Sequence, residues 1–237
     1  MTKPMKLVVG IGFAGFVCGG LALAIPTPFA WLLAWTALSC FGVAAAYATN
    51  WPGVFGKRDG RLSPFRTLLL APYLLAFRIA CLVMRARRKA PVWSEVAPGL
   101  YVGARLSGDQ LPAGVDYIVD LTCEYSEPAA LRELPGYRCV PVLDGAHPPD
   151  EEGFTALLAE LGAAQGGVLF HCESGKGRAP TAAALTLIAR GIVSDPESAV
   201  ELISKGRPSA APTRSDFGFM RRVCARLQSV DHPELLR

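Results

Sequence analysis

Charged side chains are almost absent from the first 50 residues, which contain only Lys3 and Lys6 and no acidic residue. Across the whole chain of 237 residues, 51% are hydrophobic, and the mean hydropathy is +0.30. These values are high for a soluble enzyme, because a soluble surface is normally rich in charged residues. The excess is concentrated at the N-terminus, which indicates that the chain contains more than one kind of region.

The sequence also lacks the usual metal-binding patterns. It has no Cys-x-x-Cys pair and no Cys/His cluster with metal-ligand spacing, so we expect no metal site and no cofactor. Its cysteines are odd in number and widely scattered, and we interpret all of them as reduced thiols, as expected for a domain in the cytosol. They are Cys18, Cys40, Cys81, Cys123, Cys139, Cys172 and Cys224.

Two long apolar runs follow one another at the N-terminus, over residues 7–25 and 29–47, separated by Pro26-Thr27-Pro28. Each is about the 20 residues that a helix needs to cross a bilayer. A cleaved signal peptide is the alternative for the first run, but a second run follows at once with no small-x-small cleavage site between them. We predict a transmembrane helical hairpin over residues 1–54.

Basic residues set the expected orientation of this hairpin. Lys3 and Lys6 flank its start, four Lys/Arg residues between 57 and 66 flank its end, and the connecting turn has no charge. Basic flanks favour the cytoplasmic side. We therefore expect a protein of the bacterial inner membrane or an equivalent membrane, with everything after the hairpin in the cytoplasm.

Residues 55–90 form a basic and apolar segment, with nine Lys/Arg residues against the single acid Asp59. Within it, residues 67–84 are strongly apolar but are interrupted by Pro72 and Arg78. Three interpretations stay open: a helix lying in the membrane interface, a third span, or a core helix of the next domain. Basic clusters on both flanks favour the interfacial helix, with membrane lipids as partners through their anionic head groups.

Residues 91–237 have the alternating pattern of an α/β domain and an excess of acidic residues. Alternating strands and helices predict a mostly parallel sheet flanked by helices, preceded here by the transmembrane hairpin. We expect no nucleic-acid partner. The predicted strands are 100–103, 116–121, 137–143 and 168–170, and the predicted helices are 128–134, 151–164, 181–190, 196–204 and 215–228.

The most informative stretch is residues 171–178, His-Cys-Glu-Ser-Gly-Lys-Gly-Arg, between a predicted strand and a predicted helix. A glycine-containing loop in this place points backbone N–H groups inward at the positive end of the helix, which makes an anion site. The same field would stabilise the thiolate of Cys172. Arg178 adds a planar guanidinium that suits two phosphate oxygens.

This stretch resembles the signature of the cysteine-dependent protein tyrosine and dual-specificity phosphatases: Cys172, five residues, then Arg178, with His171 and Gly175 also matching. A cysteine and an arginine at this spacing, without the other matching residues, would more often be an ordinary buried thiol followed by a polar loop. The resemblance implies that Cys172 is the nucleophile, that Arg178 is catalytic, and that His171 orients the loop. The residues implied to bind the substrate phosphate are Glu173, Ser174, Gly175, Lys176 and Gly177.

The phosphatase reaction also needs a proton donor for the leaving alkoxide. Asp144, in the loop after the predicted strand 137–143, resembles the acid of this family. Asp150 is the alternative, but it precedes two glutamates and is more typical of a helix N-terminus. Arg207, followed by proline, resembles an arginine that supports the active site of these phosphatases from behind.

One position departs from the family, which usually has Ser or Thr directly after the loop arginine, where this chain has Ala179. Thr181 or Ser174 would have to supply the missing hydroxyl. The loop with Lys176 is similar to that of the phosphoinositide 3-phosphatases, although Glu173 stands where those have a basic residue.

Two functions remain. The first is a membrane-anchored phosphatase that works through a cysteinyl-phosphate. Its substrate would be a phosphoprotein or a lipid phosphate such as phosphatidylglycerophosphate. The alternative, prompted by Ala179, is a membrane-tethered phosphate-binding adaptor with little or no turnover.

Overall fold

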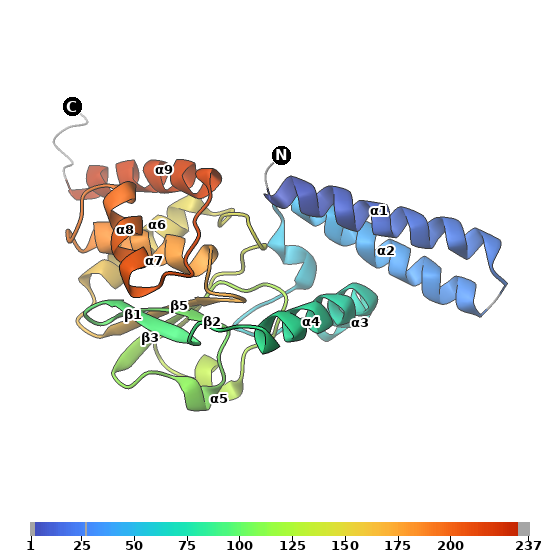
Figure 1. The fold of residues 1–237 in the computed structure, drawn as a ribbon, viewed down its shortest axis with the longest axis horizontal. Helices are drawn as coiled ribbons and strands as arrows, with labels where there is room; N and C mark the ends of the chain where they lie inside the picture. Colours follow the sequence, from blue (N-terminus) through green and yellow to red (C-terminus); the bar gives the residue numbers. More distant parts are fainter. Residues whose placement is uncertain (1–2, 27, 232–237) are drawn as a thin grey trace. The chain divides into compact units, whose positions relative to one another are not determined.

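The structure, a computed structural model, describes residues 3–26 and 28–231 (Figure 1). The chain divides into two compact units. The N-terminal unit comprises Met1–Arg88 with two short loops, Cys123–Ser126 and Leu143–Ala146. The sheet unit comprises Lys89–Thr122, Glu127–Val142 and His147–Arg237. Thr27, in the predicted connecting turn, lies outside the described residues.

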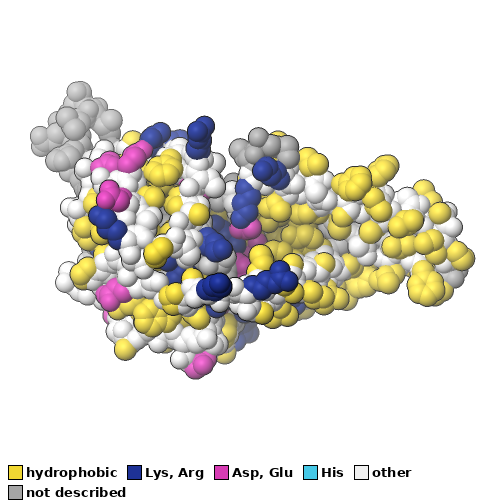
Figure 2. All heavy atoms as spheres, viewed as in Figure 1, with side chains coloured by type: hydrophobic (Ala, Val, Ile, Leu, Met, Phe, Trp, Pro, Cys, Tyr) yellow, Lys and Arg dark blue, Asp and Glu magenta, His cyan; other side chains and the backbone are white. Residues whose placement is uncertain are grey.

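In the N-terminal unit, α1 (Lys3–Ala24) packs along α2 (Phe29–Ala48). Both helices are long and apolar enough to cross a membrane, by length and composition. Gly15 lies at their closest approach, since a Cβ there would be 3.2 Å from Cys40 Cβ and 3.1 Å from the Phe41 ring. Figure 2 shows hydrophobic side chains over much of the visible surface of these two helices.

The rest of this unit consists of η1 (Pro52–Phe55), α3 (Pro64–Leu69) and α4 (Ala71–Ala86). The apolar run 67–84 is therefore not one helix, because α3 ends at Leu69 and α4 starts two residues later with proline in its first turn. Proline has no N–H to continue a helix but is tolerated in a first turn. The core of the unit is apolar and buried, and it includes Tyr47, Phe55, Leu74, Cys123 and Leu143.

The sheet unit contains five strands in the order β1-β2-β5-β3-β4. All neighbouring strands are parallel except β1 and β2, which confirms the predicted α/β class with a mostly parallel sheet. The antiparallel edge strand, which joins β2 through Pro98-Gly99, is not among the predicted strands. The strands are β1 (Trp93–Ala97), β2 (Leu100–Ala104), β3 (Val115–Asp120), β4 (Tyr137–Cys139) and β5 (Gly167–Cys172).

Four helices lie on one face of this sheet, and the short helices α5 (Ala129–Arg132) and η2 (Gly108–Gln110) lie on the other (Figure 1). Side chains of β5 alternate between the two faces, as a strand requires. Val168, Phe170 and Cys172 belong to the main core beneath the four helices, whereas Leu169 packs on the opposite face. The four helices are α6 (Glu151–Ala163), α7 (Arg178–Ala189), α8 (Pro196–Gly206) and α9 (Arg214–Asp231).

Two predicted boundaries around the anion loop were wrong. The strand predicted over 137–143 ends at Cys139, because Pro141 has no N–H for a ladder hydrogen bond. The helix predicted over 181–190 starts three residues earlier, at Arg178, directly after Gly177. Arg178 is therefore the first residue of α7 rather than part of a longer loop.

The packing of α6 predicts a large difference between two adjacent leucines. Leu158 is fully buried in the main core, whereas Leu157 is only partly buried. Leu158→Ala should destabilise the sheet unit by about 2–5 kcal/mol, because it removes core contacts and leaves a cavity. Leu157→Ala, the same chemical change, should cost clearly less. Thermal unfolding of the full chain in detergent measures both, and equal shifts would contradict this packing.

Candidate active site

The thiol of Cys172 lies at the carboxyl end of the central strand β5, where ligands bind in parallel α/β sheets. Cys172 is 2% exposed. The backbone N–H of Gly175 donates a hydrogen bond to Cys172 Sγ at 3.3 Å. The loop therefore curls around the sulfur and directs a backbone donor at it, as the sequence predicts for an anion site.

Arg178 is fixed by two backbone carbonyls of the sheet unit. Its Nη1 donates to Leu121 O at 3.0 Å and to Val142 O at 2.6 Å. Leu121 directly follows β3, and Val142 lies three residues beyond β4. The side chain is 7% exposed, so its charge is held in place at the first turn of α7, beside the loop that holds Cys172.

The loop conformation depends on glycine at position 175. Gly175 has a φ of +66°, a region that residues with a Cβ rarely adopt. A Cβ at this position would be 2.6 Å from Arg207 Nη2 and 2.8 Å from the backbone N of Ala104. Neither contact can be relieved by a small shift, since one atom belongs to β2 and the other to a buried side chain.

Arg207 supports the loop from behind. It is 1% exposed, and its Nε donates to Gly175 O at 2.9 Å. Its Nη1 donates to Val102 O and to Ser94 Oγ, both at 3.2 Å. One guanidinium thus joins the loop to β2 and β1.

A buried polar network lies beside the loop, on the sheet face opposite the four helices. Asp120 and His171 pair across β3 and β5, with His171 Nε2 3.9 Å from Asp120 Oδ1. Tyr137 donates to Asp120 Oδ2 at 2.7 Å. Burial, followed by the charge of Asp120, raises the pKa of Tyr137, so this phenol keeps its proton and remains a donor. Asp120 is not among the predicted site residues, although an acid at the end of a buried strand was a usable signal.

The same network contains the one grouping of potential metal ligands found among the described residues: Asp120, Glu127 and His171, all buried. Both oxygens of Asp120 already accept hydrogen bonds, from Tyr137 and from Thr122. Glu127 pairs with Arg105 at 3.1 Å. These contacts engage three of the four carboxylate oxygens, whereas Glu127 Oε2 and both ring nitrogens of His171 are buried without a hydrogen-bond partner among the described residues.

The two candidate acids have different surroundings. Asp144 belongs to the N-terminal unit, two residues along the chain from Val142, and its carboxylate pairs with Lys3 Nζ at 2.9 Å. Asp150 caps α6, accepting a hydrogen bond from Gly153 N at 2.9 Å, which confirms the helix-terminus interpretation of this residue.

His147, near both acids in sequence, is held within the sheet unit. Its ring stacks on Phe219 with centroids 4.5 Å apart, and its Nε2 is 3.0 Å from Asp216 Oδ1. Burial raises the pKa of Asp216, but hydrogen bonds from His147 and Thr213 outweigh that effect, so the pKa lies below its ordinary value. His147 is therefore a fixed part of the packing of α9.

The remaining predicted site residues differ in exposure. Glu173 is buried, while the side chain of Lys176 is exposed; the carbonyl of Lys176 accepts a hydrogen bond from Ala211 N at 2.8 Å. Ala179 is fully buried. Two residues further on, Thr181 Oγ1 is also buried and has no hydrogen-bond partner within the described part of the chain.

The comparisons with known proteins bear on this same region. Residues 107–233, just over half of the chain, match the family model described as "Swiss Army Knife protein, DSP-PTPase phosphatase domain". No curated protein matches the chain.

Several solved structures are similar to the chain over somewhat more than half its length. A point variant of human DUSP28 is 24% identical, covering 59% of this chain and 99% of that one, with a TM-score of 0.48. Tk-PTP in the active form is 20% identical, covering 57% and 98%, with a TM-score of 0.49. PTPMT1 in complex with PI(5)P is 17% identical, covering 60% and 99%, with a TM-score of 0.47.

The loop geometry predicts opposite outcomes for two glycines. Gly175→Ala should lower the hydrolysis of a small aryl phosphate about 100-fold, because the loop must move away from β2 and Arg207, and small misplacements at a reacting centre have effects of this size. Gly177→Ala is the matched control, since a Cβ there meets no atom within 4 Å, and it should retain most of the activity. Similar rates for the two variants would contradict the described loop.

Proposed function

The chain belongs to the family of the DSP-PTPase phosphatase domain, and on that premise we propose that it hydrolyses phosphate monoesters through a cysteinyl-phosphate at Cys172. The family makes it a phosphoric monoester hydrolase. The observation that carries the proposal is the loop from Cys172 to Arg178, in which a backbone N–H points at the sulfur and an arginine is fixed beside it.

In the first step, the Cys172 thiolate attacks phosphorus, a P–S bond forms, and the P–O bond to the leaving group breaks. Asp144 gives its proton to the departing alkoxide. Arg178 and the loop N–H groups stabilise the charge on the phosphoryl oxygens, which is where preorganised donors contribute most. Gly175 and Arg207 act on this step indirectly, by holding the loop in shape.

In the second step, water attacks phosphorus, Asp144 accepts a proton from it, and the P–S bond breaks to release inorganic phosphate and the thiolate. The family usually assists this departure with a hydroxyl after the loop arginine, where this chain has Ala179. Thr181 is the substitute that the structure favours, since its hydroxyl is buried in the first turn of α7 and has no other hydrogen-bond partner among the described residues. His171 would keep the loop oriented through its position on β5.

We further propose that residues 1–54 anchor the enzyme as a transmembrane hairpin, that residues 55–90 lie at the cytoplasmic interface, and that residues 91–237 form the cytoplasmic catalytic domain. The support is the exposure of α1, because only 6% of the most apolar stretch of this helix is buried inside the protein. An ordinary core helix would bury its apolar side chains, whereas a helix that faces lipid leaves them uncovered.

Anchoring favours a substrate that is itself in the membrane, because tethering raises the local concentration of enzyme and substrate. We propose a lipid phosphate as the first substrate class and a membrane phosphoprotein as the second. The specific observation that favours a phosphate-binding adaptor instead is Ala179, fully buried and without a hydroxyl. An adaptor would bind phosphorylated ligands through Arg178 without releasing phosphate.

The nucleophile assignment predicts that Cys172→Ser abolishes phosphate release while leaving the fold intact. Wild type and variant should be compared on lipid phosphates and on phosphopeptides in mixed micelles, with inorganic phosphate as the readout. We expect turnover of the lipid phosphate by the wild type alone. Activity retained by Cys172→Ser would refute the mechanism. A wild type that binds phospho-ligand without turnover, in a manner lost in Arg178→Ala, would establish the adaptor.

The acid assignment predicts that Asp144→Ala slows alkyl phosphates, whose leaving groups need a proton, by about 100-fold or more. Aryl phosphates with good leaving groups should be slowed much less. Asp150→Ala is the matched control, because Asp150 caps α6 and its loss should reduce stability by about 1 kcal/mol without changing this selectivity. A normal rate of Asp144→Ala on alkyl phosphates would exclude Asp144 as the acid.

A further inference from the structure

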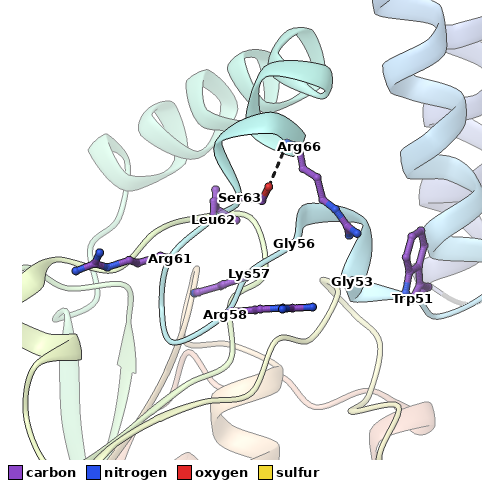
Figure 3. Close-up of a pocket in the computed structure, with 9 residues that line it drawn as sticks. All are labelled: Trp51, Gly53, Gly56, Lys57, Arg58, Arg61, Leu62, Ser63 and Arg66. Carbon is purple, nitrogen blue, oxygen red and sulfur yellow. Dashed lines mark hydrogen bonds between the residues drawn. The ribbon is translucent and has the colours of Figure 1, made fainter.

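A basic pocket lies within the N-terminal unit, in the segment that follows α2. It encloses about 520 Å³, which is in the range of small-molecule sites and much larger than a bare phosphate requires. Its lining includes four cationic residues of one short segment, together with Trp51 and Ser63 (Figure 3). The four are Lys57, Arg58, Arg61 and Arg66.

The pocket has a defined backbone. Arg58 and Arg61 exchange two hydrogen bonds, N to O, at 2.9 and 2.8 Å. Between them, Asp59 and Gly60 both have positive φ, as a tight two-residue hairpin requires. Gly56 also has positive φ, and a Cβ there would be 2.6 Å from Arg66 Cδ. Glycine at this position therefore lets the Arg66 side chain lie across the pocket.

The side chains at one end converge. In Figure 3, Arg58 and Arg66 extend toward the side of the pocket where Trp51 lies, whereas Arg61 extends the opposite way. The guanidinium of Arg66 lies 5.7 Å from the centre of the Trp51 ring. Arg58 and Arg66 thus form the two arms of a potential anion clamp, with an aromatic wall on the same side.

The three arginines of this pocket carry charge that no ion pair within the described part of the chain balances, although Asp59 lies in the turn between Arg58 and Arg61. Among residues 3–26 and 28–231, no carboxylate forms an ion pair with Arg58, Arg61 or Arg66. Lys57, the fourth cation, is buried and has an interaction partner of its own, so the unpaired charge is that of the three arginines. Several cations in one pocket repel each other, and a bound anion removes that repulsion. Arginine is also the side chain that best matches phosphate geometry.

The position in the chain indicates the source of the anion. Trp51 lies three residues after the end of α2 at Ala48, and tryptophan at the end of an apolar helix is typical of the level of the lipid head groups. Basic residues next to such a helix attract anionic lipids. The pocket would therefore lie where phospholipid phosphates are concentrated.

We propose that this pocket binds the phosphate-bearing head group of an anionic phospholipid, with Arg58 and Arg66 on the phosphate and Trp51 against the glycerol part. This site is separate from the loop at Cys172 in sequence and in residues. It depends on the membrane anchoring proposed above but not on the phosphatase chemistry. Its role is to retain anionic lipid at the base of the hairpin.

The test uses the full chain with Cys172→Ser, so that no lipid is turned over, purified in detergent and examined by native mass spectrometry. Phosphatidylglycerol and phosphatidylcholine are added separately. We expect Arg58→Gln/Arg66→Gln to weaken phosphatidylglycerol binding roughly tenfold, the loss expected for charge-assisted hydrogen bonds. Lys205→Gln/Arg214→Gln removes the same charge from two exposed residues of the sheet unit and should bind like the parent. Arg58→Gln alone is included in case the double variant fails to fold. The Arg58 side chain is exposed, so this single variant should fold like the parent.

Three results would overturn the proposal. The first is equal binding of the two lipids, and the second is equal weakening of phosphatidylglycerol binding in the two double variants. The third is an unchanged affinity for phosphatidylglycerol in both Arg58→Gln and Arg58→Gln/Arg66→Gln. Inorganic phosphate at millimolar concentration should not displace phosphatidylglycerol. If it does, the pocket is a site for free phosphate and the lipid proposal fails. Aryl phosphate hydrolysis is measured in parallel on the chain with Cys172 intact. Its absence would refute the phosphatase function while leaving the lipid result valid.

Discussion

The buried guanidinium of Arg207 is the contact on which the active-site loop depends. Its Nε donates to the carbonyl of Gly175 at 2.9 Å, while its Nη1 donates to Val102 O and Ser94 Oγ. A buried arginine is unfavourable unless its donors are satisfied, so the loop, β2 and β1 must keep their relative positions for this charge to stay paired. That constraint keeps the Gly175 N–H directed at Cys172.

The other features of the site follow from the sheet. Alternation along β5 puts Cys172 on the core side and His171 on the opposite face, next to Asp120. Cys172 is thereby attached to a rigid strand, and its neighbour His171 lies beside a hydrogen-bonded network. Arg178 completes the arrangement because the carbonyls of Leu121 and Val142 orient it from the first turn of α7. Strand, loop and helix thus place one thiol and one cation at the two ends of the same loop.

Sequence alone predicted the parts of the fold that depend on local patterns: the two apolar helices, the α/β alternation, the loop 171–178 and the cap at Asp150. It did not predict what depends on tertiary contacts. The edge strand β1 exists because it pairs with β2, and β4 ends early because of Pro141. The pocket around Arg58 and Arg66 depends on the approach of the Arg66 side chain to Gly56, which no local pattern specifies, although Asp59-Gly60 is a typical sequence for the tight turn beside it. For Asp120 the sequence shows only an acid at the end of a buried strand, whereas its pairing with His171 depends on the register of β3 and β5.

The central claim is that Cys172 carries the phosphoryl group during turnover, and direct detection of that intermediate tests it best. Asp144→Ala should slow the second step enough for the intermediate to accumulate on an aryl phosphate. After acid quenching and proteolysis, mass spectrometry should find a phosphate on the peptide that contains Cys172, and the mark should be absent in Cys172→Ser. Phosphate release at a normal rate with no modified peptide, or a mark on another residue, would contradict the account.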